Sequence, residues 1–356
     1  MKSNFRSPFK PKFIKDYKPQ NLKIRTFNAG FKKKKDDLMI LVFEKTVHVA
    51  VAYSKTSTPS APIIWDKENN YGYCKVLIVN SGNANAHTGT KGINKIKKYT
   101  KIASKIFQCN QNEVLVSSTG VIGKQLDAEN IIKKLNNFSQ SLPKYILGAA
   151  KAIMTTDTFP KVEISIIKYK SKKIAIYGFA KGSGMIAPNM GTMLAYIFIE
   201  ASINKKDLTK LLHNHIDSTF NSISVDGDTS TSDTIMIFAT GSKNSEIKIN
   251  KNSLNTISQG VHDVMLNLSK QIVSDGEGIS KLIEVEVFNA KNKIQASKVA
   301  FSIAESILVK TAVAGGDANW GRIVMAIGKA DKNINQNKII IKFNNLIAAK
   351  YGAIYS

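Results

Sequence analysis

The bond between Gly191 and Thr192 is the point in this sequence where the chain could cut itself. It lies between a glycine-rich loop that contains Pro188 and an apolar run at 194–199. The hydroxyl of Thr192 could attack the preceding carbonyl, and after an N-to-O acyl shift water would release Thr192 as a new N-terminus. The α-amino group of that threonine, with an ordinary pKa of about 7.7–8.0, could then act as general base to its own hydroxyl. A plain junction between a loop and a strand is the alternative interpretation.

The more familiar catalytic signals are missing from the sequence. Its five histidines are scattered, and it contains no GxSxG elbow, no HExxH helix and no phosphate-binding GxxxxGK[ST] loop. Asp226 and Asp228 resemble a calcium loop only superficially, because the glycine and the distal glutamate are misplaced for an EF-hand. Cys74 and Cys109 belong to no zinc-binding motif. We therefore expect no metal site and no bound cofactor.

Small and hydroxyl-bearing residues are concentrated in several loops. There are seven such loops, at 80–89 (NSGNANAHTG), 117–123 (SSTGVIG), 154–158 (MTTDT), 181–194 (KGSGMIAPNMGTML), 225–234 (VDGDTSTSDT), 274–278 (SDGEG) and 315–322 (GGDANWGR). One such loop would be an ordinary turn more often than not. Because most of them follow stretches that look like strands, we expect them to share a pocket.

Strand-like and helix-like stretches alternate along the chain and must position these loops. Short β-branched runs at 76–79 and 114–116 predict buried strands, and apolar residues at helical spacing predict a helix at 94–107. Further strands are expected at 163–169, 173–177, 194–199, 232–240 and 282–288, and helices at about 205–220, 254–273 and 297–309. Asp317 or Asn319 could cap another helix. The alternation predicts one compact, layered α/β or α+β unit.

The net charge of +25 is the most conspicuous feature of the composition. It invites a nucleic-acid-binding interpretation, because lysine and arginine neutralise phosphates. Only three of the 51 basic residues are arginine, the side chain whose fork reads bases and phosphates best, so we favour a lysine-rich surface without a nucleic-acid partner. The lysine run at 32–35 is expected to be a solvated turn, although near a site it could attract anions.

Length and hydropathy place the chain among globular proteins. Its 356 residues, 43% of them hydrophobic, are enough for one large domain or two ordinary ones. No apolar run approaches the roughly 20 residues of a membrane helix, and no secretory signal is evident. We expect a cytoplasmic protein without a membrane partner. Residues 1–22 mix lysine, proline and aromatics without a period and are expected to form a flexible basic tail.

The order of the loop motifs resembles that of the ornithine acetyltransferases, which are bifunctional enzymes of arginine biosynthesis. The resemblance runs through NSGNANA, SSTGVIG, MTTDT, KGSGMIAPNM-GT, VDGDTSTSDT, SDGEG and NWGR and covers about residues 29–329. It implies a self-processing, N-terminal-nucleophile-like α+β fold with layers in the order αββα. It also implies cleavage into an α chain at 23–191, preceded by the tail, and a β chain at 192–356, which together form one compact catalytic unit.

The resemblance further implies the reaction and its residues. Members of the family move an acetyl group from N-acetylornithine to glutamate, some also use acetyl-CoA as a co-substrate, and they assemble as α2β2 heterotetramers. The nucleophile is then Thr192, and the oxyanion-hole pair is Thr119 with Gly120. The matched substrate-binding positions are Thr155, Lys181, Thr192 and Glu277. A lysine there can pair with an α-carboxylate and a glutamate with an ammonium.

Some positions depart from the family pattern. Gly191 stands where alanine is more frequent, His87 where cysteine is common, and Gly316 where glutamate is frequent. At the C-terminus, Gly352 falls where an asparagine is expected, and Ser356 matches a terminal hydroxyl residue only with a shifted gap. Substrate affinity or choice could therefore differ. A self-processing amidohydrolase or aminopeptidase that uses the same threonine but passes the acyl group to water is the alternative enzyme.

Overall fold

The computed structural model of the protein describes residues 6–169, 172–187, 193–241 and 251–355. It divides into two compact units, Met1–Glu277 and Gly278–Ser356, where the sequence predicted one. The proposed chain boundary between residues 191 and 192 falls within the first unit, and the division into two chains there stays a prediction.

The first unit alternates strands and helices as the sequence predicts. Its elements are β1 (Leu22–Phe27), β2 (Leu38–Tyr53), α1 (Ala61–Asn69), β3 (Tyr73–Asn83), α2 (Gly89–Ile106), β4 (Val114–Val121), α3 (Ala128–Asn136), α4 (Ile146–Ile153), β5 (Lys161–Tyr169), β6 (Lys172–Lys181), β7 (Leu194–Ile199), α5 (Lys205–Ile216), β8 (Thr234–Ala239) and α6 (Lys251–Val273). The expected hairpin is β5 with β6, and β7 has the predicted bounds.

One mixed sheet carries the first unit. Its strand order is β4-β3-β2-β8-β7-β6-β5, and β1 also pairs with β2. The first half of the long strand β2 pairs with β1 and β3, whereas its second half, from His48 onward, pairs with β8. The register of β2 against β3 shifts between Val42 and Val47. Strand β2 therefore belongs to both halves of the sheet.

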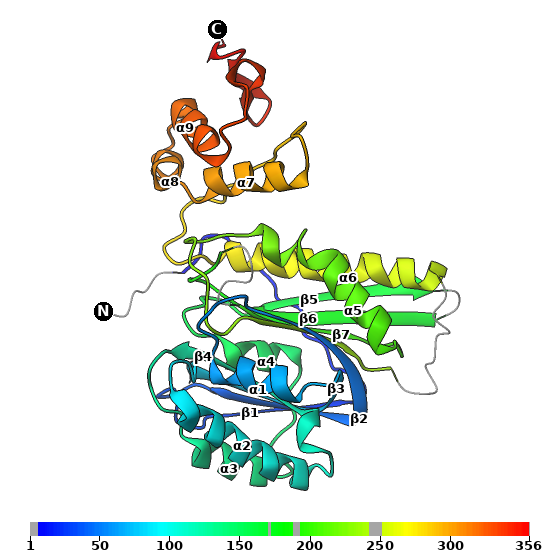
Figure 1. Cartoon of the computed structure of the whole chain (residues 1–356). Helices are drawn as coiled ribbons and strands as arrows, with labels where there is room; N and C mark the ends of the chain where they lie inside the picture. Colours follow the sequence, from blue (N-terminus) through cyan, green and yellow to red (C-terminus); the bar gives the residue numbers. More distant parts are fainter. Residues whose placement is uncertain (1–5, 170–171, 188–192, 242–250, 356) are drawn as a thin grey trace. The chain divides into compact units, whose positions relative to one another are not determined.

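The first unit has four layers, and an apolar cluster lies at each of the three interfaces between them. The inner cluster joins residues of both sheet halves, and Phe43 of β2 lies 5.1 Å from Phe238 of β8 between ring centroids. A second cluster packs α5 and α6 on the outer face of β6–β8, and a third packs α1, α2 and α3 on the outer face of β2–β4. These layers can be followed in Figure 1. The predicted αββα layering is confirmed.

The N-terminal segment is part of the fold, so the expectation of a flexible tail is wrong for the described residues 6–22. The hydroxyl of Tyr17 donates to Glu200 Oε2 at 3.0 Å, and its ring lies 4.7 Å from that of Tyr177 between centroids. Asn21 Nδ2 donates to the carbonyl of Thr240 at 3.1 Å. Ser7 is buried and bonds to the 274 carbonyl. Ile14 and Tyr17 provide apolar contacts to the inner cluster, whereas Phe9 and Phe13 are exposed.

The second unit is built from helices and one small sheet. Its elements are α7 (Lys293–Ala304), α8 (Ile307–Ala314), α9 (Trp320–Ala330), β9 (Ile340–Phe343), β10 (Leu346–Lys350) and β11 (Ala353–Ile354), with the strand order β11-β10-β9. Asn319 caps α9 as expected, because its side chain accepts from the amide of Arg322. Two predictions fail here. The helix expected at 297–309 is two helices, since Ser306 starts a new one as an N-cap, and the described structure forms no strand at 282–288.

No described helix is long and apolar enough to cross a membrane. The described part of the chain holds no group of three or more histidine, cysteine, aspartate or glutamate side chains that could bind a metal ion.

Candidate active site

The ends of β3 and β4 approach each other at a pair of glycines. In this parallel pair Gly82 lies beside Gly120, and both have positive φ angles, +103° and +133°. A Cβ atom added to Gly120 would lie 2.4 Å from the carbonyl carbon of Gly82. Only glycine permits this backbone geometry and this approach. The loops NSGNANA and SSTGVIG therefore meet because each supplies a glycine at the same level of the sheet.

Thr119, immediately before this bend, contacts a buried amine. The side chain of Lys181, at the end of β6, is 2% exposed, and its Nζ donates to Thr119 Oγ1 at 3.2 Å. A hydroxyl that accepts from an ammonium still has its own proton to donate, and the positive charge strengthens that donation. The pair could therefore stabilise an oxyanion.

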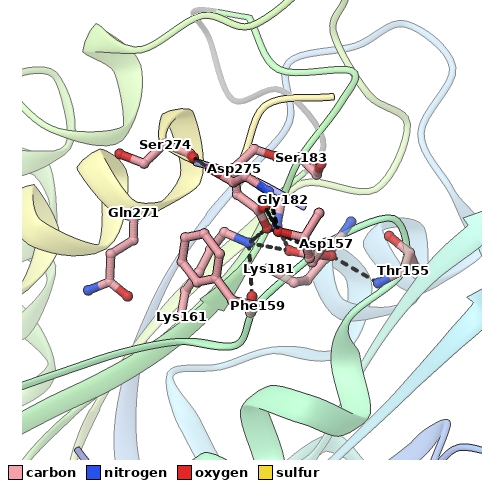
Figure 2. A network of polar contacts seen from close by, with 12 residues as sticks. Thr155, Asp157, Phe159, Lys161, Lys181, Gly182, Ser183, Gln271, Ser274 and Asp275 are labelled. Carbon is pink, nitrogen blue, oxygen red and sulfur yellow. Dashed lines mark hydrogen bonds and ion pairs between the residues drawn. The ribbon is translucent and has the colours of Figure 1, made fainter. Parts of the chain in front are cut away.

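A buried ion cluster lies beside Lys181, as Figure 2 shows. Lys161 Nζ lies 2.7 Å from Asp157 Oδ1 and 2.7 Å from Asp275 Oδ2, and all three side chains are fully buried. The ammonium also contacts the carbonyl of Phe159 at 3.3 Å. One cation therefore bridges two carboxylates that are more than 100 positions apart in the sequence.

The two carboxylates hold the loops that carry the predicted substrate contacts. Asp157 accepts from the amide of Thr155 at 2.9 Å and from the amide of Gly182, next to Lys181, at 2.7 Å. Asp275 accepts from the amide of Thr158 at 2.8 Å. The cluster thus connects the loop after α4, the end of β6 and the loop after α6.

Glu277 is connected to the same cluster by hydrogen bonds of its own backbone and of Ser183. Its amide donates to the carbonyl of Ser183 at 2.8 Å, and the hydroxyl of Ser183 donates to the carbonyl of Asp275 at 2.7 Å. A Cβ atom added to Gly184 would lie 2.8 Å from Glu277 Oε1. The glutamate is exposed, so its carboxylate is available to a ligand.

Burial and neighbouring charges set the ionisation of the cluster. Burial alone would raise the pKa of Asp157, but Lys161 and Lys181 hold that pKa well below its ordinary value. Burial lowers the pKa of Lys181, and Lys161 lowers it further, whereas Asp157 raises it. The carboxylate of Asp157 is therefore the nearby charge that does most to keep Lys181 protonated.

A further buried carboxyl, that of Asp233 directly before β8, lies at the start of β7. Asp233 Oδ1 accepts from the amide of Met193 at 2.8 Å, and the amide of Thr234 donates to the carbonyl of Met193 at 3.1 Å. Asp233 is fully buried and its Oδ2 has no hydrogen-bond partner among the described residues. Burial raises the pKa of Asp233 well above its ordinary value. Asp233 and Thr234 thus hydrogen-bond to both backbone groups of Met193, the residue that directly follows Thr192 in the chain.

The predicted site residues fall into three groups. Thr119 and Lys181 are in contact, and Gly120 follows Thr119 at the bend. Thr155 and Glu277 are joined to Lys181 through the buried cluster. The remaining calls, Gly191, Thr192 and the terminal Ser356, lie outside the described residues, and the roles of all these residues stay predictions.

Several residues of the site were not predicted from the sequence. They are Lys32, Asp157, Lys161, Asp233 and Asp275. The three aspartates occur inside the motif loops MTTDT, VDGDTSTSDT and SDGEG, and acidic residues in small-residue loops were the available signal. Lys161 gives no such signal, because 48 lysines are spread along the chain, and the run at 32–35 marks Lys32 only together with its three neighbours.

Comparison of the sequence with known proteins gives matches over nearly the whole chain. A family model described as the ArgJ family matches residues 23–355. The arginine biosynthesis bifunctional protein ArgJ of Bradyrhizobium diazoefficiens is 44% identical over 356 residues, which cover 98% of this chain and 86% of that protein. The protein of the same name from Agrobacterium fabrum is 41% identical, with 97% and 86% covered.

Solved structures give weaker matches. A crystal structure of the arginine biosynthesis bifunctional protein ArgJ from Bacillus halodurans matches with a TM-score of 0.44 and 32% identity, covering 48% of this chain and 91% of that chain. An ornithine acetyltransferase from Mycobacterium tuberculosis, complexed with ornithine, matches with a TM-score of 0.41 and 26% identity, covering 48% and 92%. The family assignment rests on the sequence matches.

Proposed function

The chain belongs to the ArgJ family, and we propose that it is an acetyltransferase of arginine biosynthesis that moves an acetyl group from N-acetylornithine to glutamate. The observation that carries the proposal is the contact of the buried Lys181 ammonium with the hydroxyl of Thr119, next to the bend at Gly120. That arrangement suits the stabilisation of an oxyanion, which every acyl transfer forms.

The first step of the proposal is self-cleavage. The hydroxyl oxygen of Thr192 attacks the carbonyl carbon of Gly191, and the peptide C–N bond breaks as the new C–O bond forms an ester. Water hydrolyses that ester, leaving a carboxylate on Gly191 and a free α-amino group on Thr192. The products are an α chain that ends at residue 191 and a β chain that begins at residue 192.

Acetyl transfer then follows a ping-pong route. The hydroxyl of Thr192 attacks the acetyl carbonyl of N-acetylornithine, its proton passes to the α-amino group of the same residue, and that proton leaves with the amine of ornithine. The amine of glutamate next attacks the acetyl ester and releases Thr192. Thr119 and the amide of Gly120 would each stabilise the oxyanion by on the order of 3 kcal/mol. Acetyl-CoA could serve as a second acetyl donor.

Substrate recognition is assigned to groups of the same pocket. Lys181 pairs with the α-carboxylate that both substrates carry, and the exposed carboxylate of Glu277 pairs with an ammonium of the ornithine moiety. Thr155 contributes a hydroxyl from the loop that Asp157 holds. The hydrogen bonds between Ser183, Asp275 and Glu277 support this assignment, since they hold the backbone of Glu277 beside the segment that follows Lys181.

The assembly and setting are further parts of the proposal. We infer an α2β2 heterotetramer of the cleaved chains in the cytoplasm, with small-molecule substrates and without a bound cofactor, a membrane or a nucleic acid as partner. The scarcity of arginine supports the last point.

The self-cleavage and the acetyl-enzyme can be tested together by mass measurement. We expect purified protein to run as two chains, and the β chain to gain the mass of one acetyl group after incubation with N-acetylornithine alone. Thr192→Ala should stay uncleaved and unacetylated, whereas Thr58→Ala, which changes an exposed threonine, should behave as wild type. A wild-type chain that persists as one band, or an unmodified β chain, would contradict the proposal.

A further inference from the structure

Lys32 differs from the other lysines of the run at 32–35. The side chains of Lys33, Lys34 and Lys35 are exposed, whereas that of Lys32 is half-buried. Its ammonium bonds to the hydroxyl of Ser81 and donates to two main-chain carbonyls. The expected solvated turn therefore holds for three of the four lysines.

The three acceptors around the ammonium come from two separate parts of the site. Ser81 lies near the end of β3, where it pairs with Thr119 of β4. The carbonyls are those of Ala152 at 3.2 Å and Met154 at 2.6 Å, at the C-terminal end of α4 and directly before Thr155. The last carbonyls of a helix lack partners within it and favour a cation. An ammonium has three protons, and these three acceptors occupy them.

The loop between β1 and β2 is built to deliver this lysine. The buried carboxylate of Asp37 accepts from the amide of Lys32 at 2.6 Å and from the amide of Ala29 at 2.6 Å. The carbonyl of Asp37 in turn accepts from the amide of Ser81 at 2.8 Å. The backbone of Lys32 and the strand that its side chain contacts are therefore fixed by one residue.

We propose that Lys32 is a positioning residue that fixes Thr119 relative to Thr155, and this inference rests on the proposed acetyl transfer. Its ammonium joins the strand pair that carries the oxyanion-hole residues to the loop that carries a substrate contact. Because all three ammonium protons are donated to these acceptors, Lys32 acts through its neighbours and does not donate a proton to the substrate.

The charges around Lys32 make its action depend on pH. Burial lowers the pKa of Lys32 to about 8; Asp37 and Asp157 favour the charged form, and Lys35 and Lys181 oppose it. Above that pH the folded protein loses the ammonium and one of its three bonds. An unfolded chain keeps the proton up to its ordinary pKa of about 10.4, so this group alone would make stability rise as the pH increases from 8 to 10. The positioning, in contrast, weakens over the same range.

The first test compares Lys32→Met with Lys33→Met, a control that changes an exposed lysine of the same turn. We expect Lys32→Met to lower kcat for transfer by about 10–100-fold, as for a small misplacement of catalytic groups. KM should change less than kcat, because the charged substrate contacts Lys181 and Glu277 are untouched and only the contact of Thr155 shifts. Lys32→Arg, which keeps the charge and the donors, should recover part of the loss. Equal kcat values for Lys32→Met and Lys33→Met would overturn the inference.

A pH profile separates positioning from a general structural role. We expect wild-type kcat to rise with pH as the Thr192 amine loses its proton. It should fall again above about pH 8, where the ammonium of Lys32 loses its proton. Lys32→Arg should keep the rise and lose the fall, because guanidinium stays charged. A fall that persists unchanged in Lys32→Arg would assign it to another group, such as Lys181, and would contradict this part of the inference.

Hydrogen exchange supplies a readout that needs no activity. In Lys32→Met the amides of Thr155 and Ser81 should exchange faster than in wild type, and in Lys33→Met they should not. Exchange that is the same in both variants would overturn the inference. A wild-type chain that moves no acetyl group would instead defeat the proposed function, and the exchange comparison would still decide whether Lys32 holds the loop.

Discussion

Replacement of Lys161 by methionine should destabilise the protein more than any surface change. The ammonium of Lys161 lies 2.7 Å from the carboxylates of Asp157 and Asp275, and none of the three side chains is exposed. Methionine fills a similar volume but leaves two carboxylates facing each other in the interior. Removal of one partner from a buried ion pair costs about 3–5 kcal/mol. We expect a loss of that size in the free energy of unfolding at pH 7.

The loss in the free energy of unfolding caused by Lys161→Met should be smaller at acid pH. In the folded protein the pKa of Asp157 lies well below its ordinary value, so its ionised form stabilises the fold above that ordinary value, about 4, and this contribution disappears as the pH falls further. Of the two lysines that keep this pKa low, Lys161 has the larger effect. In Lys161→Met the carboxyl of Asp157 therefore takes up a proton at a higher pH than in wild type. The difference in unfolding free energy between wild type and variant should therefore be larger at pH 7 than near pH 4.

Urea unfolding measures this difference, with both proteins carrying Thr192→Ala so that dissociation of cleaved chains does not contribute. Lys168→Met, on the same strand but exposed, is the matched control and should stay within about 0.5 kcal/mol of the parent. Adding Asp275→Asn to Lys161→Met removes one of the two stranded charges and should restore part of the loss. A loss below 1 kcal/mol for Lys161→Met, or one that is independent of pH, would refute the reasoning.

Two further predictions concern the oxyanion region. Gly120→Ala should prevent cleavage and transfer or yield misfolded protein, because its Cβ would lie 2.4 Å from the carbonyl carbon of Gly82, whereas Gly123→Ala, which also has a positive φ but no atom within 4 Å, should lose less; equal soluble yield and activity for the two would contradict the packing argument. Lys181→Met should lower kcat/KM for both substrates by at least the roughly tenfold that 1.4 kcal/mol represents, since it removes the charge that contacts Thr119; transfer at the wild-type rate would show that this ammonium serves the fold alone.

Much of the first unit could be predicted from local sequence. The hairpin of β5 and β6 and the apolar strand β7 follow from short β-branched runs between turn residues, and these signals need no tertiary information. The segment 282–288 shows the limit of such signals. Its residues alternate between exposed and half-buried, as in a strand, yet within the described residues it has no partner strand, and alternation alone cannot supply one.

The site was predictable where small residues mark it and not where charges do. Gly120 stands out because it lies next to the end of a strand, in the sequence SSTGVIG, and the structure gives it the positive φ that glycine permits. Lys161 and Lys32 look like any other lysine. Asp275, one partner of Lys161, and the carbonyl of Met154, one partner of Lys32, are more than 100 positions away in the sequence, and only the fold brings them together.

The transfer of acetyl between two amino acids tests the central claim most directly. Purified protein is mixed with N-acetylornithine and glutamate, without acetyl-CoA, and N-acetylglutamate, ornithine and acetate are measured over time. We predict equal amounts of N-acetylglutamate and ornithine with little acetate, and no product with Thr192→Ala. Accumulation of acetate and ornithine without N-acetylglutamate would mean that water accepts the acetyl group, and would contradict the assignment of a transferase.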